Sequence, residues 1–225
     1  MEEIKHINMK LKHILIMAFA VVAMATACKK DKYVIGGSLH DPHVNMTTYD
    51  YLKTNRLFDT LLVLIDKAGM KEEINGDVTF FAPTDYSIKA LLKRREEKLQ
   101  QDNNDENLRY TLNDLPVPEL RDSLRSHIFA GKMTRESLSL NNKLVTSKSN
   151  EPFVVKLIEQ ESPGLVSNKP QILFLIKIRN GLDPNPTPEN YPTEDLDLYT
   201  FAQTSNIQTT TGVLHVLTNT HRFYW

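Results

Sequence analysis

The hydrophobic pattern of the chain changes once, near its middle. Between residues 47 and 131, apolar residues recur mainly at intervals of three and four, which is the period of an amphipathic helix. From residue 143 they alternate instead with polar residues, as in β-strands. A helical first part joined to a stranded second part predicts an α+β domain, and no internal repeat is visible.

The first predicted elements are a helical pair and a strand. The pair lies between residues 47 and 69, and a capping box of Thr47 and Asp50 opens it. The strand covers residues 77–83, where β-branched and aromatic side chains occur together and Pro83 ends the run.

A second set of helices is expected in the middle of the chain. Thr84 or Asp85 should cap a helix that continues into the charged stretch 93–101. The segment 102–114 is predicted to be a flexible insertion, because its many Asn and Asp side chains favour turns. A further helix is expected over residues 118–131, with proline in its first turn and glycine at its end.

The remaining predicted elements are short, and most of them are strands. Among them lies the proline-dense segment 180–195, which should be an exposed irregular loop. The expected elements are a helix at 134–138 and strands at 143–147, 153–158, 172–178 and 213–217.

The N-terminal part of the chain has the features of an export signal that ends in a lipid anchor. An apolar run from Ile14 follows basic residues and ends in small residues before Cys28, and it is too short to span a bilayer. Residues 25–28 resemble the bacterial lipobox, which implies that the Cys28 thiol is alkylated with diacylglycerol and becomes the new N-terminus. Ala25 stands where that motif usually has leucine. A buried cysteine, or a thiol that follows an ordinary signal peptide, is the alternative interpretation.

These features divide the chain into a signal peptide over 1–27, an anchor and flexible tether over 28–43, and one domain over 44–225. Lys and Arg number 27 against 28 Asp and Glu, so no basic excess favours nucleic acid as a partner. Cys28 is the only cysteine. If it carries lipid, no disulfide can form, and apolar burial must hold the domain together.

Three segments of the domain resemble a known family. Residues 79–85 resemble the first signature of the fasciclin-type FAS1 domain, and Ile207 together with residues 212–217 resembles the second. Residues 124–131 are similar to the central histidine segment of that family. The positions that carry these motifs are Phe81, Ala82, Pro83, Thr84, Asp85, His127, Gly212 and His215.

This resemblance spans residues 44–223 and implies a wedge-like β-sandwich with flanking α-helices. It also implies adhesion or extracellular ligand binding rather than catalysis. Two positions depart from the family pattern, because Ser126 precedes His127 where tyrosine is common, and Thr218 takes the place of aspartate after the second signature. Both departures argue against an animal-type receptor and leave the expected fold intact.

The sequence contains few candidates for chemistry. His127 and His215 are expected to be buried and bonded to the backbone rather than to act as ligands or bases, since neither has a nearby motif partner. Residues 40–43 include two histidines and an aspartate, but a flexible tether does not preorganise a metal site. No catalytic residue, cofactor or metal ion is therefore predicted.

The sequence predicts a lipid-anchored protein of the bacterial cell envelope whose domain binds an extracellular protein or glycan. Lys29 and Lys30 favour the outer membrane, because they replace the aspartate that marks inner-membrane retention. The candidate contact regions are the insertion over 102–114 and the proline-dense loop over 180–195, where the ring of Tyr191 can stack on sugar or protein. Two alternatives remain open: an accessory glycan-binding lipoprotein of a nutrient-uptake complex, and a hydrolase with paired carboxylates.

Overall fold

A computed structural model describes residues 41–161 and 169–224 of the chain. The predicted signal peptide, Cys28 and the tether up to residue 40 lie outside the described residues. Pro42 contacts the sheet, because its carbonyl accepts a hydrogen bond of 2.8 Å from the Gln208 amide. Within the described ranges, no helix combines the length and the apolar character needed to cross a bilayer.

The first half of the domain is helical, as predicted. Helix α2 (Thr48–Lys53) begins after Thr47, whose hydroxyl accepts a hydrogen bond of 3.1 Å from the Asp50 amide. Helix α3 (Asp59–Ala68) ends at Gly69, which has a left-handed φ of 65°. The other helical elements are η2 (Arg56–Phe58), α4 (Lys71–Ile74), α5 (Asp85–Asn103), η3 (Leu112–Asp114), α6 (Val117–Arg125) and η4 (Arg135–Ser137).

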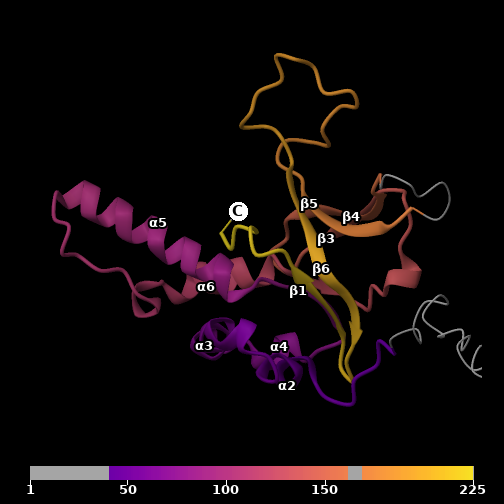
Figure 1. The fold of residues 1–225 in the computed structure, drawn as a ribbon, viewed down its shortest axis with the longest axis horizontal. Coiled ribbons are helices and arrows are strands. Elements are labelled where there is room, and N and C mark those ends of the chain that lie inside the picture. The colour runs from indigo at the N-terminus through magenta and orange to yellow at the C-terminus, as the bar shows by residue number, and fades with distance from the viewer. Residues whose placement is uncertain (1–40, 162–168, 225) are drawn as a thin grey trace, which may run out of the picture. The chain divides into compact units, whose positions relative to one another are not determined.

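Within the described ranges, seven strands form one mixed sheet in the order β2-β1-β7-β6-β5-β4-β3. Figure 1 shows that this sheet is curved. The pair β1 and β7 is parallel, and the other neighbouring strands are antiparallel. A further bridge joins Phe129 to Ser147, which brings the two ends of the sheet together in a near-barrel. The strands are β1 (Val78–Ala82), β2 (Ile128–Ala130), β3 (Lys143–Thr146), β4 (Pro152–Glu159), β5 (Gln171–Lys177), β6 (Leu198–Gln208) and β7 (Val213–Leu217).

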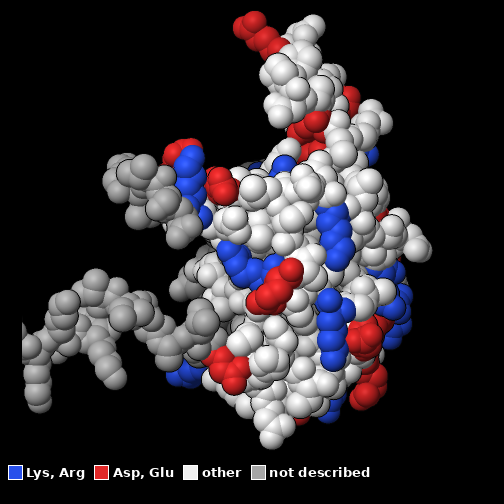
Figure 2. Space-filling view, turned by 90° about the vertical axis from the view of Figure 1, so that its right-hand side faces the viewer, with Lys and Arg blue, Asp and Glu red and all other residues white. Residues whose placement is uncertain are grey.

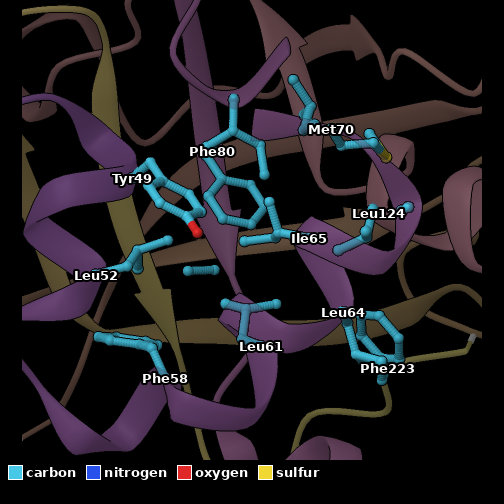
Figure 3. Close-up of a cluster of buried hydrophobic side chains, with 14 of the residues drawn as sticks. Tyr49, Leu52, Phe58, Leu61, Leu64, Ile65, Met70, Phe80, Leu124 and Phe223 are labelled. Carbon is cyan, nitrogen blue, oxygen red and sulfur yellow. The ribbon is translucent and has the colours of Figure 1, made fainter. Parts of the chain in front are cut away.

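Strands β1 and β7 are buried on both faces, because a separate apolar core packs on each side. On one side, Phe80 joins the buried side chains of the helices, including Ile65 and Leu124 (Figure 3). On the other side, Phe81 packs with Phe153 of β4 and its apolar neighbours inside the near-barrel. The result is an α+β wedge in which helices flank a curved sheet, as the resemblance implied.

Strand β6 links the two parts of the sheet, and its existence was not predicted. Residues 198–201 pair with β5, whereas residues 202–208 pair with β7 and contain two register shifts. Each shift adds one residue to β6, so its side chains do not alternate regularly between faces. Beyond residue 201, the sequence pattern therefore lacks the period that is typical of a strand.

Two predicted boundaries are wrong. The helix expected over 118–131 ends at Arg125, and residues 128–130 form β2, because pairing with β1 satisfies their backbone groups. The segment 102–114 is not a free insertion. Helix α5 extends into it as far as Asn103, and the Lys67 ammonium group donates to three carbonyl groups near its end at 2.7–2.9 Å.

Candidate functional site

The two signature segments lie side by side in the sheet. Phe81 in β1 is the register partner of His215 in β7, and their ring centroids are 4.8 Å apart. Phe81 and His215 are fully buried, and Val213 on the same face of β7 is also buried. The sequence prediction that His215 points inward is confirmed.

His215 has a structural task at the irregular part of β6. Its Nδ1 accepts a hydrogen bond of 3.0 Å from the amide of Asn206, which lies within a register shift and has a φ of 68°. Its Nε2 donates to the Met133 carbonyl at 2.9 Å. Burial lowers the pKa of His215 to about 4, so the ring is neutral near pH 7. The ring thus satisfies the Asn206 amide, which the bulge removes from the ladder, and the Met133 carbonyl.

Gly212 is required by the close approach of β1. A Cβ atom at this position would lie 2.4 Å from the carbonyl oxygen of Val78. The obstruction comes from the neighbouring strand.

The corner after β1 uses its polar residues differently from the prediction. Neither Thr84 nor Asp85 caps α5 with its side chain. Instead, the Asp85 carboxylate accepts hydrogen bonds of 3.0–3.1 Å from the amides of Thr60 and Leu61, at the start of α3. The Thr84 hydroxyl donates to Asn219 at 3.0 Å. The first signature therefore ties two helices and the C-terminal segment together.

His127 forms a buried pair with His221, a residue that the sequence analysis did not single out. The Nδ1 atom of His127 donates to the Ser123 carbonyl at 2.7 Å, so its Nε2 accepts a hydrogen bond of 2.7 Å from Nε2 of His221. Burial lowers the pKa of His127 to about 4 and also lowers that of His221. Because the ring nitrogens of His127 are used in this way, it is not poised as a base for an external substrate.

A polar groove of about 430 Å³ lies above this pair, between α6 and the turn before β4. Three carboxylates line it, which is the feature that a hydrolase would need. Glu151 forms an ion pair of 2.6 Å with Lys177, and Glu119 pairs with Arg95. Two of the three carboxylates, Glu119 and Glu151, are thus already paired with basic side chains of the protein, rather than arranged as the free carboxylate pair of a hydrolase.

The loop over residues 180–195 is irregular and largely exposed, as predicted. It projects from the top of the sheet between β5 and β6 (Figure 1). At its base, the Asp183 amide donates to Asp197 at 3.0 Å, and the Asp197 amide donates to Asp183 at 3.1 Å. Tyr191 lies on this loop, where its amide donates to the Pro188 carbonyl at 3.1 Å. Its role as a ligand contact stays a prediction.

A second hollow lies beside the base of this loop, on the outer face of the sheet. We call it the outer hollow; its volume is about 370 Å³, and it lies between Val154 and Ile176 of the sheet and residues 182–187 of the loop. Tyr199 in β6 is the register partner of Ile176 in β5. It lines the hollow and is 54% exposed. Tyr199 was not among the predicted contact residues, because β6 was not predicted. Aromatic residues at the alternate positions 199 and 201 are the signal that was present.

Charge does not dominate the surface on the side that carries β3 and β4. In Figure 2, Lys and Arg are interspersed with Asp and Glu among uncharged residues, and neither sign forms a continuous field on that face. Within the described ranges, no group of three or more His, Cys, Asp and Glu side chains is arranged to hold a metal ion.

The comparison with protein-family profiles agrees with this architecture. The profile of the fasciclin domain family matches residues 56–172, which is just over half of the chain. The chain belongs to this family. The matched range contains the first signature and His127, whereas Gly212 and His215 lie beyond it.

Solved structures include a FAS1 domain pair from the insect cell adhesion molecule fasciclin I. It has 12% sequence identity with this chain and a TM-score of 0.43, and the match covers 76% of this chain and 49% of that one. The chain therefore spans about half the length of that structure. No curated protein sequence matches the chain significantly.

Proposed function

We propose that this protein is a lipid-anchored member of the fasciclin family in the bacterial cell envelope, and that it binds an extracellular protein or glycan without chemically converting it. The lipobox-like segment that ends at Cys28 supports the anchor. Family membership supports the binding role, because FAS1 domains occur in adhesion-type proteins.

The observation that carries the binding role is the construction of the loop over residues 180–195. The paired hydrogen bonds between Asp183 and Asp197 close the base of the loop, and the Arg179 guanidinium donates to the Glu194 carbonyl at 2.9 Å. The loop is thus an exposed segment whose base is fixed by hydrogen bonds. Binding residues occur disproportionately on loops of this kind.

The buried histidines support a role without catalysis. His127 and His215 are the motif residues best suited to proton transfer, yet both are fully buried. Both nitrogens of each ring are already engaged with protein groups.

Loop replacement tests this function. In the full mature chain, residues 184–192 are replaced by a Gly-Ser segment of equal length, which retains Asp183 and Asp197 and therefore the base of the loop. Binding is measured against panels of oligosaccharides and purified extracellular proteins. We expect binding to be lost, whereas the same replacement of residues 104–109 at the tip beyond α5 should retain it. Unchanged binding in the first variant would contradict the proposed role of the loop.

A further inference from the structure

The outer hollow has the composition of a small-ligand site. Its volume of about 370 Å³ falls within the range of about 300–1,000 Å³ that is common for such sites. Its floor is apolar, because Val154 and Ile176 point to the outer face of the sheet. Tyr199 and Leu182 add an aromatic and an aliphatic wall, and both are more than 40% exposed.

Several polar groups that line the hollow have no partner within the described part of the chain. The Lys156 ammonium group, the amides of Asn142 and Asn185, and the Tyr199 hydroxyl form no hydrogen bond or ion pair with another described residue. These groups converge from β4, from β6, from the segment before β3 and from the loop. They can therefore donate to and accept from a ligand without breaking contacts of the fold.

The charges around the hollow restrict the ligand. Asp183 and Asp197 line it together with Lys156, so carboxylates outnumber ammonium groups. Asp197 is held in place, because its two oxygens accept from the amides of Arg179 and Asp183 at 3.2 and 3.0 Å. An anionic ligand would meet these carboxylates, and like charges disfavour its binding.

We propose that the outer hollow binds an uncharged sugar residue of a glycan. A sugar ring presents C–H groups on its faces and hydroxyl groups around its rim. The faces fit the Tyr199 ring and the apolar floor, and the hydroxyl groups fit the amide and ammonium groups of Asn142, Asn185 and Lys156. This inference rests on the proposed binding function and names the glycan as its ligand.

The exposed aromatic surface continues along β6 beyond the hollow. Phe201 lies two residues after Tyr199 on the same face, is 37% exposed, and contacts Phe174 with ring centroids 5.7 Å apart. Positions i and i+2 of a strand are separated by about 7 Å. A second sugar ring can thus pack on Phe201 while the first occupies the hollow.

Calorimetry with defined oligosaccharides tests this site. The full mature chain is titrated with uncharged oligosaccharides and with uronic-acid oligosaccharides of equal length. We expect binding of uncharged ligands only. Tyr199→Ala should weaken it about five- to tenfold, and Tyr199→Phe should retain most of it. Lys156→Met should weaken it severalfold.

Tyr86→Ala is the matched control, because Tyr86 lies on α5 and is 57% exposed. It should leave binding unchanged, and thermal melting should show that each variant is folded. Preference for acidic glycans, or binding that is insensitive to Tyr199→Ala, would overturn the inference. Binding of an extracellular protein but of no glycan would also overturn it, and the proposed function would then stand. Failure to bind any member of either panel would count against both.

Discussion

The Nε2 atoms of His127 and His221 lie 2.7 Å apart in a buried contact between the start of β2 and the C-terminal segment. The contact holds one proton between the two rings, because Nδ1 of His127 donates to Ser123. Phe223 also stacks on His127, with ring centroids 5.8 Å apart. The segment after β7 therefore packs on His127, and this packing requires the His127 ring to be neutral.

Acid should destabilise the fold, because burial lowers the pKa of His127, His221 and His215. Burial lowers the pKa of His127 and of His215 to about 4 in the folded state, whereas an unfolded histidine has a pKa near 6.5. Between pH 6.5 and pH 4, the unfolded chain therefore binds more protons than the folded domain. The stabilisation from the neutral histidines is complete above pH 6.5 and is lost as the pH falls toward 4. Between pH 7 and pH 5 the free energy of unfolding should fall by about 2 kcal/mol for each such histidine.

Urea denaturation at several pH values measures this effect, and ring NMR titration assigns it. We expect the resonances of His127 and His215 to show no titration above pH 5.5. A free energy of unfolding that is constant from pH 7 to pH 5 would contradict the prediction.

Gly212→Ala should strongly destabilise the domain. The new Cβ atom would lie 2.4 Å from the Val78 carbonyl oxygen, and the parallel ladder between β1 and β7 prevents either backbone from moving away. We expect a loss of about 3 kcal/mol in the free energy of unfolding.

Gly131→Ala provides the comparison for that measurement. A Cβ atom there meets no described atom within 4 Å, but the φ of 75° makes alanine cost about 1 kcal/mol. Chemical denaturation measures the free energy of unfolding of both variants. Equal losses would show that the close approach to Val78 does not cause the destabilisation of Gly212→Ala.

Asp85→Ala should loosen the start of α3 rather than that of α5. It removes the acceptor for the Thr60 and Leu61 amides and leaves these buried or partly buried donors without a partner. We expect a loss of about 2 kcal/mol, whereas Asp59→Ala, at an exposed position on the same turn, should cost less than about 0.5 kcal/mol. Hydrogen exchange should locate the loss of protection in α3. Loss confined to α5 would argue against this assignment.

Cys28→Ser should leave the protein without lipid and with residues 1–27 still attached. The thiol is the atom that a lipobox would have alkylated, so serine prevents both lipid attachment and the cleavage that follows it. Mass spectrometry of the native product should find a mature chain that begins at lipid-modified Cys28. A bare thiol with the leader still attached would contradict the anchor, without affecting the assignment of the fold.

Local sequence signals predicted many of the elements. Capping and side-chain alternation depend on neighbours in sequence, so they can be recognised without the fold. Examples are the capping box at Thr47, the strand that ends before Pro83, and the alternating runs of β4 and β5. The signature residues also indicated the family before any fold was seen. His215 was correctly expected to be buried and bonded to the backbone.

Tertiary structure alone decided the rest. Residues 128–130 have helical spacing but form a strand, since β1 offers them hydrogen bonds. Asp85 caps a distant helix because the fold brings α3 to it. His221, Tyr199 and the outer hollow arise where segments far apart in sequence meet, and the bulged strand β6 carries no regular period. The sequence determined the elements whose stabilising contacts are local, whereas partners across the chain exist only after the sheet has closed.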